Sequence, residues 1–209
     1  MKKAEKKTTQ KHMSTKGQSS EDRKSQEGSG MQNEYGRAGE QSLHTVLEKG
    51  LKDIYSAEKQ LVEALPEVIQ AVDDEELEEA VSKHLEQTKK QVARLEKAFE
   101  RMGIPKENEE KCAPMEAMIE ETRKIIREHQ RSAVRDAALI MGAQKIEHYE
   151  IATYGSLCEF CDVLGDDRLG DLLGRSLEEE EDADEVLSDI AKDVNDQANE
   201  MAMHEEEYH

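Results

Sequence analysis

Six side chains of the types that bind metal ions recur through the larger, C-terminal part of the chain. Five are carboxylates and one is an imidazole: Glu58, His84, Glu147, Glu150, Glu180 and Asp184. Each lies in a run of regularly spaced apolar residues, at or near a position where the spacing calls for another apolar side chain. Carboxylate and imidazole together are the ligands that iron, manganese or zinc takes in proteins. If the fold brings these side chains together, they form a metal site.

The three cysteines offer a second candidate chemistry. Cys158 and Cys161 form a C-x-x-C pair, a spacing that occurs in redox and zinc sites. The pair lies in a helical apolar pattern rather than after a strand, so we expect core-facing or half-buried thiols instead. Cys112 makes the count odd, which argues against a disulfide framework and favours a reducing compartment.

Helical periodicity predicts the elements that position these residues. Apolar residues at steps of three and four indicate four long helices, the last two running over about 134–164 and from about 168 to 194. An acidic turn at 73–76, the stop signals Gly103 and Pro105, and a tight turn at 165–167 separate the helices. A shorter helix at 115–131 occupies the long connection between the second and third.

This order predicts an all-α fold, a ferritin-like four-helix bundle with one long crossover that contains a short helix. The bundle should span residues 42–194. Residues 1–41 contain no Leu, Ile, Val or Phe and are predicted to be a disordered low-complexity arm. Residues 195–209 lose the apolar pattern and are predicted to be a flexible acidic tail.

The candidate ligands fall near the midpoints of the long helices, where packing would bring them to one level. On the second helix His84, Thr88 and Gln91 occupy the apolar seam. Buried unpaired carboxylates cost several kcal/mol or take up protons, and the same seam carries no Lys or Arg to neutralise them. The facing of Glu180 is uncertain by one position, so Glu179 or Glu181 could take its role. His84 could instead be a partly exposed core histidine.

The charge of the chain excludes some partners. Its formal charge is −20, and the acidic excess lies entirely after residue 41. So acidic a domain repels phosphate backbones, which argues against nucleic-acid binding. The longest apolar runs are far shorter than a membrane span, and the Lys-rich start has no apolar segment after it, so we expect a cytoplasmic protein.

Several segments resemble the YciE/YciF-type family of ferritin-like bacterial proteins, which are associated with stress responses. They are Leu51 to Leu61, His84 to Thr88, Arg94 to Glu96, Asp136 to Ile140, Gln144 to Gly155 and Leu177 to Asp184. The resemblance implies the ferritin-like fold over about 43–194. Ferritin-like di-iron proteins usually carry Glu-x-x-His on two helices, whereas the four long helices here carry none. Gln91 stands where a histidine is expected, which predicts a site richer in carboxylate.

The predicted layer of candidate ligands at the helix midpoints is consistent with two functions. In the first, two iron or manganese ions per chain are bound, with Glu58 and Glu147 as bridging ligands and His84, Glu150, Glu180 and Asp184 completing the site. Such a protein could oxidise Fe(II) with O₂ or peroxide. In the second, the layer is vestigial or metal-free, and the protein is a non-catalytic stress-response scaffold or binding dimer. An iron-storage cage is a weaker third. A homodimer is expected from apolar faces on the first two helices.

Overall fold

The computed structural model describes residues 42–105 and 110–206, with side chains described to Met201. The helices of this part of the chain are α1 (Leu43–Ala71), α2 (Glu75–Met102), α3 (Ala113–Glu128), α4 (Ala133–Leu164) and α5 (Asp167–Glu206). No strand occurs in it. The arm predicted for residues 1–41 lies outside the described residues.

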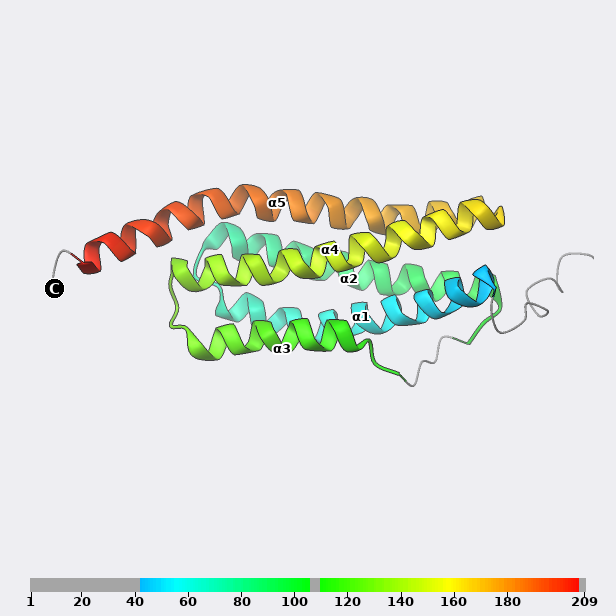
Figure 1. The fold of residues 1–209 in the computed structure, drawn as a ribbon, viewed down its shortest axis with the longest axis horizontal. Coiled ribbons are helices and arrows are strands. Elements are labelled where there is room, and N and C mark those ends of the chain that lie inside the picture. The colour runs from blue at the N-terminus through cyan, green and yellow to red at the C-terminus, as the bar shows by residue number, and fades with distance from the viewer. Residues whose placement is uncertain (1–41, 106–109, 207–209) are drawn as a thin grey trace, which may run out of the picture. The chain divides into compact units, whose positions relative to one another are not determined.

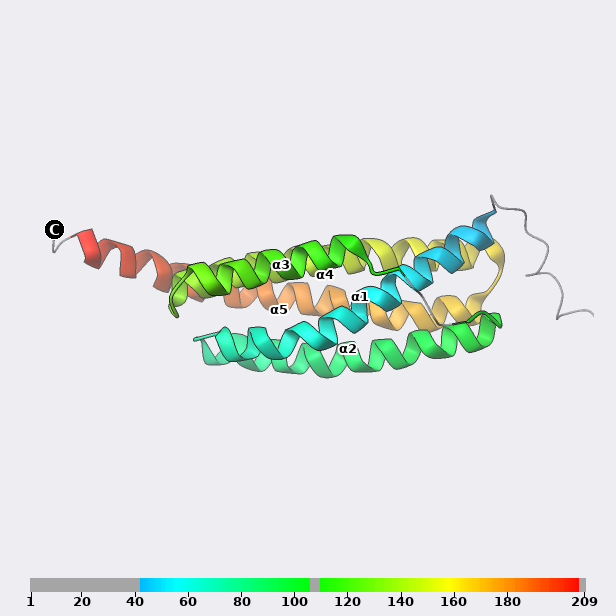
Figure 2. The same cartoon turned by 90° about the horizontal axis from the view of Figure 1, so that it is seen from below.

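The four long helices form the bundle, and α3 packs on its outside. Helix α1 contacts α2 and α4, and α5 contacts the same two helices. Helix α3 lies against α1 and α4 (Figures 1 and 2). It returns the chain from the end of α2 to the start of α4, so that neighbouring long helices run antiparallel (Figure 1). The predicted all-α fold with one crossover helix is confirmed.

The helix ends follow the predicted breakers. Ser42, Asp74 and Ser132 each accept a hydrogen bond from a backbone N–H three residues later, which caps α1, α2 and α4. Gly103 and Gly165 end α2 and α4 in the left-handed conformation, with φ of 66° and 73°.

Helix α5 is longer than the sequence pattern predicts. Val194 is its last buried apolar residue among the described side chains, so the core does end where the pattern stops. The helix nevertheless continues to Glu206, because no Gly or Pro follows and the segment is rich in helix-forming Ala, Glu and Met. Its C-terminal end extends beyond the other helices (Figures 1 and 2).

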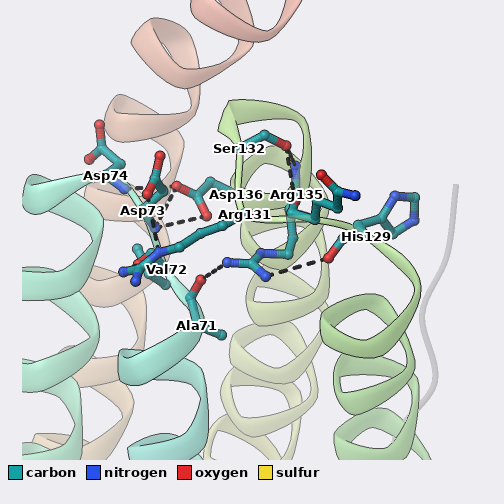
Figure 3. A network of polar contacts seen from close by, with 10 residues as sticks. Ala71, Val72, Asp73, Asp74, His129, Arg131, Ser132, Arg135 and Asp136 are labelled. Atoms are coloured by element: carbon teal, nitrogen blue, oxygen red, sulfur yellow. Dashed lines mark hydrogen bonds and ion pairs between the residues drawn. The ribbon is translucent and has the colours of Figure 1, made fainter.

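A polar network joins the α1–α2 hairpin to the α4–α5 hairpin and fixes their positions along the bundle axis. The Asp136 carboxylate at the start of α4 accepts hydrogen bonds from the backbone N–H groups of Asp73 and Asp74, at 3.0 and 2.8 Å. Arg135 donates to the carbonyl oxygen of Ala71. Figure 3 shows these contacts gathered at the α1–α2 turn. The midpoints of α1, α2 and α4 are thereby held in register.

Candidate metal centre

A layer of buried polar side chains lies in the middle of the bundle. Glu58 on α1, Glu150 on α4 and Glu180 on α5 have exposed fractions of 0%, while Glu147 has 3% and His84 has 8%. On α2 and α5 this layer separates two apolar clusters, one containing Leu95 and Leu173 and the other Val81 and Leu187. The four long helices therefore converge at their polar midpoints, as the seam defects predicted.

Four of these side chains come close enough to share one ion. One ligand atom each from His84, Glu147, Glu150 and Glu180 lies within 4.8 Å of the other three. His84 Nε2 is 3.5 Å from Glu147 Oε1, and His84 Nδ1 is 3.9 Å from Glu180 Oε2. Three helices supply the cluster, so its geometry depends on the packing of the whole bundle.

Glu58 belongs to the layer but not to this group of four. Its Oε1 accepts a hydrogen bond of 2.5 Å from the Tyr154 hydroxyl, and its Oε2 has no hydrogen-bond partner. Burial, and after it the charge of Glu180, raises the pKa of Glu58, so the two carboxyls are electrostatic neighbours. The bridging role expected for Glu58 stays a prediction.

Asp184 lies apart from the cluster. Its side chain is 22% exposed, 3.4 Å from His148 Nε2 and 3.3 Å from the Gln144 amide that donates to it. Asp184 lies on the same face of α5 as Glu180, one turn further along the helix. At that level the neighbouring residues of α4 are the polar Gln144 and His148. Asp184 is not one of the four side chains whose ligand atoms lie within 4.8 Å of one another, although its charge, after burial and the nearer carboxylates, helps to raise the pKa of Glu147.

Burial shifts the pKa values of the layer strongly. Burial, and then the charge of neighbouring carboxylates, raises the pKa of Glu58, Glu147 and Glu150 well above the usual range for glutamate. Burial also raises the pKa of Glu180 to about 7 and lowers the pKa of His84 to about 4. Without a cation, the layer therefore favours neutral side chains.

The layer also collects unpaired polar atoms. In the described part of the chain, every buried side-chain nitrogen or oxygen that lacks a hydrogen bond, except Arg135 Nε, lies in this layer. They belong to Glu58, His84, Gln91, Glu147, Glu150 and Glu180. Buried polar atoms are nearly always paired in proteins, and a cation bound by carboxylate and imidazole would pair these. The donor set fits iron or manganese.

Two residues of the layer were not predicted from the sequence. The hydroxyl of Tyr154 donates a hydrogen bond to Glu58, a contact that the spacing of the sequence does not indicate. The expectation of no cation at the seam was also wrong, because Arg94, one turn after Gln91, donates to Glu179 at 2.9 Å. Burial raises the pKa of Glu58 and of Glu180, and the charge of Arg94 offsets a smaller part of that rise. The step of three from Gln91 was the only sequence signal for it.

The ion pair of Arg94 shows which glutamate of the run at 178–181 faces inward. Glu179 forms an ion pair with Arg94, and Glu181 is exposed to solvent. Glu180 is completely buried and accepts a hydrogen bond from the Gln91 amide. The inward residue is therefore Glu180, as first predicted.

The cysteines are placed as expected. Cys161 is buried, Cys158 is half-buried, and both are free thiols. Burial raises the pKa of both, that of Cys161 to about 12. A thiol held protonated in this way is a poor nucleophile.

Comparison with known proteins places the chain in a family. Residues 42–200 match the family described as "Domain of unknown function (DUF892)". The chain belongs to this family. It is 43% identical over 153 residues to Protein YciF of Escherichia coli (strain K12), covering 73% of this chain and 92% of that protein. The predicted family resemblance is confirmed.

Solved structures of relatives show the same fold. The crystal structure of the E. coli stress protein YciF matches with a TM-score of 0.72 and 39% identity, covering 75% of this chain and 99% of that one. YcfI of Rhodopseudomonas palustris matches with a TM-score of 0.68 and 36% identity, over 71% of this chain and 94% of that one. Among the described residues, no helix is long and apolar enough to cross a membrane.

Proposed function

We propose that this chain is a stress-associated metal-binding protein that holds two iron or manganese ions in the polar layer. His84, Glu147, Glu150 and Glu180 would hold one ion. Glu58, with Glu147 as a shared ligand, would hold the second. The observation that carries the proposal is the set of buried, unpaired nitrogen and oxygen atoms in this layer, because a bare layer of this kind is costly.

The association with stress comes from the relative alone. YciF of E. coli is named a stress protein, and the two chains share the fold over most of their length. Iron bound in the layer would supply redox chemistry, and Fe(II) oxidised by O₂ or peroxide is the reaction we propose. The residues of the chain would bind and orient the ions, and the apolar clusters on either side of the layer would exclude bulk water.

Metal analysis tests this function. Full-length protein purified without chelator, or dialysed anaerobically against Fe(II) or Mn(II), should contain two ions per chain. Glu180→Gln should lose metal, because it removes a ligand from the group of four. The matched control Glu181→Gln changes the exposed neighbour and should keep the full content. Wild-type protein free of metal after dialysis, or equal metal in both variants, would contradict the proposal.

A metal-free scaffold is the second candidate, and one observation favours it. Burial, and then the charge of neighbouring carboxylates, raises the pKa of Glu147 and Glu150 well above the usual range for glutamate. Protons bound at neutral pH could therefore take part of the role of a cation. If the dialysed protein holds no metal while its fold and stability are unchanged, this function becomes the better description.

The homodimer stays a prediction, and its surface needs revision. Among the described side chains, the exposed large apolar residues lie on α1, α4 and α5 rather than on α1 and α2. They are Val46, Val134, Met141, Val163, Val186 and Met201. Light scattering of the full-length protein should give twice the mass of one chain.

A further inference from the structure

An apolar cavity lies inside the bundle, next to the polar layer. Its volume is about 80 Å³, and all five helices contribute to its wall. Most of the wall is aliphatic, and it includes Leu61, Val68, Val81, Ile126, Ile146 and Leu187. His84 and Glu147 line it as well. The cavity therefore ends on two members of the group of four.

Small residues leave this space open. Ala64, Ala80, Ala143 and Ala183 face the cavity from α1, α2, α4 and α5. A larger aliphatic residue at one of these positions would fill part of it. Unfilled core volume lowers the stability of a protein, so an opening to which four helices each contribute an alanine is a costly feature unless it is used.

The chemistry of the wall decides what fits. A water molecule needs two to four polar partners, which the aliphatic part of the wall, away from His84 and Glu147, does not offer. An apolar cavity of about 150 Å³ stays dry and takes benzene or xenon. A space of about half that size takes a molecule of a few heavy atoms at most. The adjacent carboxyl groups disfavour anions.

The cavity also reaches the surface. Exposed Lys83 on α2 and exposed Asp182 and Val186 on α5 are among its lining residues. On the side of α1 and α3 it is lined by Glu67 and Arg123, which form an ion pair of 2.9 Å. A small molecule can therefore enter from solvent without unfolding the bundle.

We propose that this cavity is a binding site for a small uncharged apolar molecule of the size and polarity of dioxygen, held beside His84 and Glu147. Water and hydrogen peroxide are poor ligands for its aliphatic part, because both need hydrogen-bond partners that this part lacks. Binding itself requires no metal. Only the use of the bound molecule as a reactant rests on the proposed metal-binding function.

Dissolved O₂ is paramagnetic and provides a direct probe. In metal-free, full-length protein under O₂ pressure, methyl protons of the cavity residues Val81, Leu139 and Leu187 should relax several-fold faster than those of Leu47 and Leu51. All five residues are buried, but the two controls belong to the other core cluster. Xenon should shift the same cavity methyl signals in proportion to its pressure. Equal relaxation of both sets would overturn the proposal.

Two filling variants sharpen the test. Ala64→Leu and Ala183→Leu should each lose the O₂ enhancement and the xenon shift, whereas Ala93→Leu, at an exposed position of α2, should keep both. Leu65→Ala enlarges the cavity and should strengthen xenon binding, which keeps the test decisive if a filling variant does not fold. Filled variants that still bind would contradict the assignment. Because no metal is present, failure here leaves the proposed metal site standing, and the reverse also holds.

Discussion

Single residues decide whether the polar layer holds protons or cations. Both carboxyl oxygens of Glu150 are buried without a hydrogen-bond partner, and both ring nitrogens of His84 share that state. Glu58 and Glu180 are partly satisfied by Tyr154 and Gln91. The least satisfied side chains are therefore the ones with most to gain from a metal ion.

The first prediction compares Glu150, a member of the group of four, with Asp184, which lies outside it. Glu150→Gln should weaken Mn(II) binding by more than about tenfold, the scale on which even supporting residues of metal sites act. Asp184→Asn removes the same charge from a position that already bonds Gln144 and His148. It should change the affinity little. Titration of Mn(II) followed by electron paramagnetic resonance measures both, and equal losses would show that Asp184 is a ligand after all.

The second prediction concerns pH. Glu58, Glu147, Glu150 and Glu180 have pKa values raised above those of the unfolded chain. The folded metal-free protein therefore holds more protons, and its free energy of unfolding should rise as pH falls from 8 towards 6.5. Below 6.5 the His84 pKa, lowered to about 4, acts in the opposite direction, since the unfolded chain then takes up the proton.

Urea unfolding at a series of pH values measures this effect. Bound metal should reverse the trend, because metal requires deprotonated ligands. A metal-free protein whose stability is flat or increases between pH 6.5 and 8 would contradict the raised pKa values.

At the scale of helices, the sequence predicts the helix boundaries better than the positions of the site residues. Period and breakers were sufficient for most ends of the long helices, because Ser42, Asp74 and Ser132 cap three of them and Gly103 and Gly165 end two. The end of α5 was missed because loss of an apolar stripe marks the end of a core rather than of a helix. The displacement of Asp184 and the approach of Arg94 depend on how neighbouring helices rotate against each other, which one-dimensional spacing does not contain.

The third prediction concerns the contact that sets helix register. Asp136→Asn should lower the free energy of unfolding by about 1–3 kcal/mol, because the buried carboxylate caps two backbone N–H groups at the α1–α2 turn. Asp73→Asn is the matched control. It weakens only an exposed ion pair with Arg131 and should cost less than about 1 kcal/mol. Chemical denaturation of both variants gives the comparison, and equal costs would remove Asp136 from this role.

At the scale of the whole molecule, one segment provides the fold and most of the charge. The family match covers residues 42–200, and the acidic excess of the chain also falls after residue 41. An acidic surface attracts cations from solution and repels anions. The charge of the molecule and the chemistry of its interior therefore favour the same kind of ligand.

The fourth prediction is that residues 1–41 are dispensable for folding. Limited trypsin digestion should leave a core that begins near Arg37. Deletion of these residues should leave the melting temperature unchanged, because a segment without Leu, Ile, Val or Phe buries little apolar surface. A core that melts several degrees lower than the full chain would show that the arm packs on the bundle.

The central claim is that the midpoint layer binds the metal, and paired thermal melts test it most directly. The melting temperature of the wild-type protein should rise on adding Fe(II) or Mn(II) under anaerobic conditions. The double variant Glu58→Gln, Glu147→Gln should be more stable than wild type without metal, by about 1–3 kcal/mol, because an amide is buried without first having to take up a proton or a counterion. It should show no rise with metal. A control that changes the exposed Glu159 and Glu181 to Gln should behave as wild type. If the Glu58 and Glu147 variant keeps the full metal-induced rise, the layer is not the metal site.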